Sequence, residues 1–210
     1  MQEPKIIKLI NLTLNFIIMK TKIQIALFVL TTLFTVSLNA QEKKSTTIKA
    51  DSVIIDFHAG TPLEDIDAKS TDAKGIIKLS TGEFAFVVSN RSFHFKRSLM
   101  EEHFNENYME SDKYKVSTYK GKIVDYDKLD LSKDGTYKVV TKGILNIHGV
   151  EQEREIEGEI IVKDGKIHIV STFMVKLEEH KIKIPKVVTE KIAEEVKVNV
   201  NAYFDTNNLR

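Results

Sequence analysis

The chain of 210 residues contains no cysteine and no tryptophan, and only three prolines and nine glycines. Without cysteine it has no disulfide, no thiolate metal site and no cysteine nucleophile, so packing and main-chain hydrogen bonds must stabilise it. The sequence also lacks a P-loop, a glycine-rich dinucleotide fingerprint and a nucleophile elbow. Because these absences remove the usual sequence arguments for catalysis, we expect a non-enzyme without a cofactor.

The charge is balanced, with a formal net charge of +1. Of the 31 lysines and arginines and the 30 aspartates and glutamates, four and one, respectively, lie in the first 40 residues. The rest of the chain is therefore close to neutral and slightly acidic. Such a surface has no electrostatic footprint for nucleic acid, and we expect no nucleic-acid partner.

The N-terminal region has the pattern of an export signal. Lys20 and Lys22 precede an apolar run over 23–36, and residues 37–40 end on a small residue suited to cleavage. This run is shorter than the stretch of about 20 residues that a membrane-spanning helix needs. No cysteine follows it that could carry a lipid anchor.

We therefore predict a start at Met19, with residues 1–18 upstream of it, and a signal peptide cleaved after Ala40. Residues 41–210 then form one domain, which is long enough for a sizeable core. We expect this domain to be periplasmic or secreted, with no stable membrane span once the signal is removed. A retained N-terminal membrane anchor is the alternative.

Alternating apolar and polar residues dominate the mature chain and are typical of half-buried strands. Turn signals such as Gly82 and Asp164-Gly165 separate these segments. Regularly spaced strands of this kind predict an antiparallel barrel or sandwich. The eight predicted strands are 46–57, 75–79, 83–88, 114–126, 136–148, 154–162, 166–177 and 196–204.

One segment has helical periodicity instead. Ser98 and Glu101 have the spacing of a capping box, in which each side chain bonds the other residue's main chain. Five large side chains then share one side at helical spacing: Leu99, Met100, His103, Phe104 and Tyr108. The pattern predicts a short amphipathic helix over 98–107.

The histidines and carboxylates do not form a recognisable metal or catalytic motif. No two histidines have the His-x-His or His-x-x-x-His spacing that would place both rings on one face of a strand or helix. Adjacent acids such as Glu101-Glu102 point apart, whereas general acid–base catalysis needs convergent carboxyls. We expect no metal site, and a metal-assisted hydrolase is the least favoured alternative. His148, beside Gly149 at a strand end, is the histidine of most interest.

Aromatic and large apolar side chains gather on a few elements. An eight-stranded barrel can be just wide enough to hold one small ligand, and an apolar ligand gains about 25 cal/mol per Å² removed from water. The pattern leaves open whether these side chains line a cavity or fill an ordinary core. The candidate lining residues are Phe84, Phe86, Val88, Phe93, Phe95, Met100, Phe104 and Phe173.

Three blocks of the sequence resemble the YceI-like family. The first is LMEEHFNENYMES at 99–111, and the second runs from Lys113 through TYKGKI at 118–123. The third is YKV at 137–139 with GILNIHGV at 143–150, which is similar to that family's G-x-L-x-I-x-G-V strand and turn. The order and spacing of the blocks make the resemblance fairly specific, and it extends over about residues 45–204.

The resemblance implies an all-β fold, an antiparallel eight-stranded lipocalin-like barrel with one short helix at about 98–107. It also implies export to the periplasm and, in some members, a polyisoprenoid or other long amphiphile inside the barrel. We expect a carrier of a hydrophobic small molecule or lipid, with an isoprenoid or fatty-acyl chain, that is a monomer or homodimer. The alternative is a ligand-free envelope module with a filled core, stress-related or partner-binding.

Overall fold

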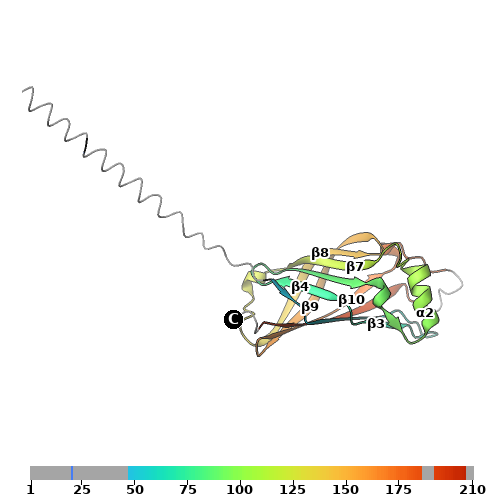
Figure 1. Cartoon of the computed structure of the whole chain (residues 1–210), viewed down its shortest axis with the longest axis horizontal. Helices are drawn as coiled ribbons and strands as arrows, with labels where there is room; N and C mark the ends of the chain where they lie inside the picture. Colours follow the sequence, from blue (N-terminus) through green and yellow to red (C-terminus); the bar gives the residue numbers. More distant parts are fainter. Residues whose placement is uncertain (1–19, 21–46, 186–191, 207–210) are drawn as a thin grey trace, which may run out of the picture. The chain divides into compact units, whose positions relative to one another are not determined.

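The computed structural model describes residues 20, 47–185 and 192–206. The chain divides into two units, Met1–Lys44 and Ser45–Arg210. In the second unit the strands form an elongated barrel, and helix α2 (Ser98–His103) lies at one end of it (Figure 1). The all-β, antiparallel fold class predicted from the sequence is confirmed.

The predicted export segment falls almost wholly outside the described residues. Lys20 is described, whereas the predicted start at Met19 and the cleavage position after Ala40 are not. Within the described part of the chain, no helix has the length and apolar character needed to cross a membrane. Export therefore stays a prediction.

The strands vary widely in length. Eight have five residues or more: β2 (Ser52–His58), β4 (Lys74–Lys78), β5 (Glu83–Ser89), β7 (Val116–Ile123), β8 (Gly135–Ile147), β9 (Val150–Lys163), β10 (Lys166–Lys176) and β11 (Glu195–Asp205). Three are shorter: β1 (Thr47–Lys49), β3 (Asp67–Ser70) and β6 (His94–Phe95). Single helical turns complete the fold: η2 (Asn90–Ser92), η3 (Phe104–Tyr108), η4 (Tyr126–Lys128) and η5 (Glu178–His180).

All strand pairs are antiparallel, in the order β1-β4-β5-β7-β8-β9-β10-β11-β2-β3-β6. The eight longer strands correspond to the eight predicted ones, but the described residues form eleven strands in all. Part of the difference arises because the predicted strand over 46–57 is interrupted at Ala50 and Asp51. Its first half, β1, pairs with β4, while its second half, β2, pairs with β11. This bent segment therefore connects β1, at one end of the strand order, to β2, which lies third from the other end.

Two-residue turns connect the longest strands. Asp164 and Gly165 have φ values of 51° and 73°, as a type I′ turn requires, and they join β9 to β10 in register from Lys163 and Lys166 onward. His148 occupies the equivalent left-handed position between β8 and β9, with a φ of 52°. The predicted reversals at 149 and 164–165 are thus confirmed.

The predicted helix is present and begins at Ser98 as expected, but its capping and its C-terminal end differ. α2 ends at His103 and continues as a π-helical turn, η3, rather than as one helix to residue 107. The predicted capping box is wrong, because Arg97 is the N-cap and its side chain makes no capping bond. The Glu101 carboxylate instead accepts a hydrogen bond from the main-chain N–H of Phe95 (3.2 Å). Glu101 therefore fastens the helix to β6.

A packed core fills the end of the barrel near the β9–β10 turn. Phe204 on β11 lies opposite Ile167 on β10, and Ile167 lies opposite Val162 on β9. Ala202 lies opposite Val53 of β2 in the neighbouring ladder. All five side chains are buried, and they belong to one hydrophobic cluster. The barrel is therefore filled at this end.

Candidate ligand-binding cavity

Toward α2 the barrel is hollow and holds a cavity of about 540 Å³. Every described strand except β1 and β3 contributes to its wall, together with α2 and η3. Along β10 the inward side chains of Ile169, Ser171, Phe173 and Val175 line it, whereas Ile167 belongs to the filled end. A volume of this size lies within the range of about 300–1,000 Å³ typical of small-molecule sites.

The structure brings all eight candidate lining residues together around this cavity. They come from four strands or turns and from the helical segment: Phe84, Phe86 and Val88 on β5, Phe93 after η2, Phe95 on β6, Met100 and Phe104 from the helical segment, and Phe173 on β10. That these side chains contact a ligand stays a prediction. Their convergence follows from strand alternation, which places residues two apart on the same face.

Aromatic rings form two groups in the wall. Near α2, Phe104 lies 5.1 Å from Phe95, 5.6 Å from Phe57 and 5.8 Å from Phe93 between ring centroids. Phe57 was not among the predicted lining residues, although its alternation with Val53 and Ile55 on β2 would have indicated it.

The second group consists of Phe84, Phe86 and Tyr119. The ring centroid of Phe84 lies 5.1 Å from that of Tyr119 and 5.9 Å from that of Phe86. Edge or tilted contacts at these distances hold rings in fixed positions. Both groups therefore form rigid parts of the wall.

The helical segment covers one end of the cavity. The five side chains predicted to share its apolar side, Leu99, Met100, His103, Phe104 and Tyr108, all line the cavity. Leu99 is 59% exposed, so it lies where the wall reaches the surface. Burial raises the pKa of the Tyr108 hydroxyl above its ordinary value, which keeps it uncharged at neutral pH.

Several of the polar side chains that line the cavity bond to the protein itself. The Tyr119 hydroxyl lies 2.9 Å from Thr141 Oγ1, and Thr141 Oγ1 donates to the carbonyl of Ile156 (2.9 Å). Ser117 Oγ donates to the amide oxygen of Asn90 (2.8 Å). Desolvation raises the pKa of Tyr119, so this group also stays neutral. The interior therefore offers largely apolar surroundings.

Charged residues border the cavity next to α2, where they pair with one another. Arg97 and Glu64 both line the cavity, and they form an ion pair. Lys96 Nζ lies 3.3 Å from Asp65 and 3.2 Å from Asp67. These pairs connect the loop between β2 and β3 to the chain that enters α2.

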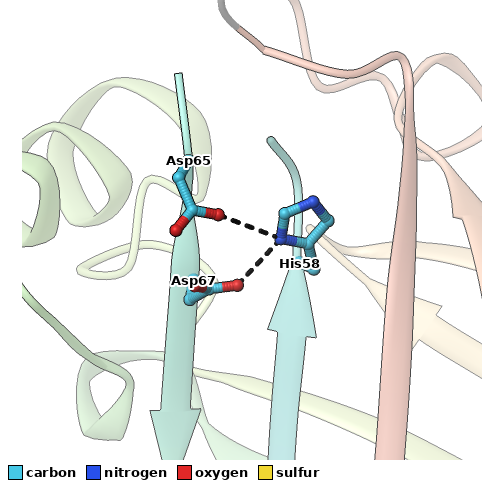
Figure 2. Close-up of side chains that lie close together, drawn as sticks. All are labelled: His58, Asp65 and Asp67. Atoms are coloured by element: carbon cyan, nitrogen blue, oxygen red, sulfur yellow. Dashed lines mark hydrogen bonds and ion pairs between the residues drawn. The ribbon is translucent and has the colours of Figure 1, made fainter. Parts of the chain in front are cut away.

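His58 joins the same network, as Figure 2 shows, with its Nδ1 2.8 Å from Asp67 and 3.6 Å from Asp65. The hydrogen bond from His58 is the main cause of the lowered pKa of Asp67. One histidine and two carboxylates are ligands that a cation could use, and their ligand atoms lie within 4.8 Å of one another. Here Lys96 already contacts both carboxylates, so the cluster serves as an ion-pair network.

The comparisons with known proteins agree with this geometry. The sequence model of one family, the YceI-like domain, matches residues 32–204, which is most of the chain. The chain belongs to the YceI-like family. No curated protein matches its sequence significantly.

Two solved structures show how far the YceI-like fold extends at low sequence identity. A polyisoprenoid binding domain from Saccharophagus degradans, implicated in plant cell wall breakdown, is 14% identical with a TM-score of 0.64, over 78% of this chain and 99% of that one. Burkholderia cenocepacia BcnA is 11% identical with a TM-score of 0.61, over 72% and 95%. At these identities the likeness establishes the fold alone.

In this YceI-like barrel, His148 and His180 connect the β8–β9 turn, η5 and the chain after η3. His148 Nε2 lies 2.9 Å from the Glu110 carboxylate, and its Nδ1 lies 3.1 Å from the carbonyl oxygen of His180. The ring also contacts Tyr114, with 4.3 Å between centroids. The histidine singled out in the sequence therefore fastens the β8–β9 turn to η5 and to the chain after η3.

His180 is fully buried, and desolvation lowers its pKa from 6.5. Because the folded protein holds this ring neutral, its stabilising contribution is complete above the unfolded pKa and is lost as pH falls through and below it. We expect the free energy of unfolding to decrease as pH falls below about 6.5, and less steeply in H180Q. Urea unfolding at each pH measures the slope. H94Q, at an exposed position, is the control and should keep the wild-type slope; an unchanged slope in H180Q would contradict the assignment.

Proposed function

We propose that this YceI-like protein is an exported carrier that holds a hydrophobic ligand, a polyisoprenoid or a fatty-acyl chain, inside its barrel. The observation that carries the proposal is the cavity of about 540 Å³, whose wall is formed mainly by apolar side chains. The likeness of the fold to a polyisoprenoid binding domain supports the ligand class. The export pattern of the sequence supports a periplasmic or secreted location.

The chemistry of the wall fits binding rather than catalysis. Each methylene group that moves from water into such a cavity gains about 0.8 kcal/mol. The hydroxyls of Ser117, Thr141 and Ser171 donate to amide or carbonyl oxygens, an arrangement that satisfies these groups without activating a nucleophile. Arg97 is paired with Glu64. A largely apolar interior of this kind favours the long apolar part of an amphiphile.

The competing proposal is a ligand-free envelope module with a filled core. That proposal requires aromatic side chains that pack against one another and leave no tunnel. The end of the barrel around Phe204 meets this requirement, but the part next to α2 does not. The hollow part therefore favours the carrier.

Native mass spectrometry of the protein purified from its own cell envelope tests the proposal. We expect a bound molecule that organic extraction releases as a prenyl or acyl lipid, and a polypeptide that begins at Gln41. A variant without residues 1–40, purified from cytosol, is the control for the compartment.

The carrier proposal would be contradicted if the protein is empty in both preparations and takes up neither prenyl lipids nor fatty acids in vitro. An N-terminus at Met19 in the envelope preparation would instead contradict cleavage. That result would leave ligand binding in the cavity untouched, because the mass spectrum reports the bound molecule and the N-terminus independently.

A further inference from the structure

β9 and β10 are neighbours in the sheet, but they pair over only part of their length. Their ladder runs from Lys163 opposite Lys166 to Glu159 opposite Val170. Beyond it, residues 150–158 of β9 continue in register with β8, and residues 171–176 of β10 continue in register with β11. Among the described pairings these two stretches are not joined to each other. We call the boundary between them the β9–β10 seam.

The seam begins at Gly158, where the two strands are still very close. A Cβ atom built on Gly158 would lie 2.9 Å from the carbonyl oxygen of Val170 and 3.4 Å from Cβ of Ser171. Side chains are rarely tolerated at the first of these distances, so glycine permits the close approach at this point. The strands part from there toward η5.

Side chains bridge the seam in place of a main-chain ladder. Ser171 Oγ donates to the carbonyl of Glu157 (2.6 Å), and Arg154 Nη2 donates to the carbonyl of Met174 (2.8 Å). Arg154 Nη1 also lies 3.3 Å from the Glu179 carboxylate. A side-chain bond can break by rotation of one residue, whereas a ladder separates only when a whole strand moves.

The cavity reaches both sides of the seam. Glu157 and Gly158 of β9 contribute to its wall, as do Ser171, Phe173 and Val175 of β10. Glu157 is exposed to solvent and yet borders the cavity. An opening of the seam would therefore lead from the side of the barrel directly into the hollow part.

The end covered by α2 is more firmly held. Phe104 packs there against three other phenylalanine rings, and the Arg97–Glu64 and Lys96–Asp65 pairs fasten the adjoining loop. Opening this end would separate rings and ion pairs together. Between Gly158 and η5 the seam is crossed by the side-chain bonds of Ser171 and Arg154, while bonds from His148, Gln152 and His180 hold its outer end at η5. Opening the middle of the seam would therefore require mainly the side chains of Ser171 and Arg154 to rotate.

We propose that the β9–β10 seam is the lateral entry through which the apolar chain of the ligand passes into and out of the cavity. The proposal rests on the proposed carrier function for the nature of what passes. Arg154 and Ser171 are positioning residues, because they hold the seam closed by bonds to main-chain carbonyls.

A staple across the seam tests this route. In R154C/E179C a short bis-maleimide takes the place of the ion pair, and the absence of native cysteine leaves these as the only thiols. With parinaric acid as the probe, we expect the staple to slow release to phospholipid vesicles at least about tenfold, because local opening is then blocked.

The control is K142C/E155C, which places the same staple on an ion pair between β8 and β9, where the ladder is complete. This staple should leave release unchanged. Equal release rates in stapled and unstapled R154C/E179C would overturn the seam as the route.

A second measurement does not depend on ligand binding. V139C places a single thiol in the cavity wall, and N-ethylmaleimide must enter the barrel to label it. We expect labelling to be about tenfold faster in R154A/V139C than in V139C, because bonds to a charged group are lost, and unchanged in K142A/V139C. Failure of parinaric acid to bind would contradict the carrier function alone. Unchanged labelling in R154A/V139C, or acceleration only in R97A/V139C, would overturn the seam.

Discussion

Replacing Phe204 by alanine is expected to lower the free energy of unfolding by about 3–5 kcal/mol, the usual cost of removing a large side chain from a packed core. Phe204 is 1% exposed and lies opposite Ile167 at the filled end of the barrel. The side chains around it are held by ladders to β10 and, through β11, to β2, so they cannot collapse into the space. Urea unfolding measures the change, which is a large part of the stability of a typical domain.

The matched control is the same substitution at Phe173, which is half-buried and borders the cavity. F173A should cost about 1–2 kcal/mol, because the lost side chain already had open space on one side. F204A should keep the affinity for parinaric acid, whereas F173A should change it. Equal losses of stability in the two variants would contradict the division into a filled and a hollow part.

Filling the cavity should abolish most of the ligand affinity without unfolding the protein. In I169W the larger side chain would point from β10 into the hollow part. Affinity for parinaric acid is expected to fall about 50–100-fold, since displacing on the order of 100 Å² of apolar contact costs about 2.5 kcal/mol. Fluorescence titration gives the dissociation constant, and thermal unfolding shows that the barrel is intact.

I144W is the control for this change, because Ile144 lies on the outer face of β8 and is 37% exposed. It should bind the probe as the wild type does. If both variants bind with wild-type affinity while remaining folded, the ligand lies elsewhere and the cavity is not the binding site. If both lose affinity, the effect is not specific to the interior.

The strands and turns could be predicted because their signals are local. Val196, Val198 and Val200 alternate with polar residues, and the structure places all three along the cavity wall. Asp164-Gly165 forms the two-residue turn that its sequence indicates. The position of α2 could also be predicted from a local signal, the helical spacing of its apolar side chains. Its capping could not. Glu101 bonds to Phe95 on β6, a contact that exists only once the helix lies on the barrel.

The candidate site was predicted in part. The eight chosen side chains line one cavity because alternation and helical periodicity fix the face that each presents. Phe57 was missed, although it shares the parity of Val53 and Ile55 on β2, because apolar and polar residues alternate only weakly in that stretch. The Arg97–Glu64 ion pair could not be predicted from the sequence, because its members are 33 residues apart and meet only in the folded chain.

The sequence by itself determined the composition of the two faces of each strand, the turns between the strands and, through the motifs at 99–150, the family. Only the tertiary structure decided that the inward side chains fill the barrel around Phe204 but leave a cavity between that end and α2. The reason is that alternation says which side chains point inward, whereas the diameter and closure of the barrel set the distance between them. The β9–β10 seam has the same origin. Each strand alone could pair on both edges, and the divergence of the two neighbours ends their ladder at Val170 and Glu159.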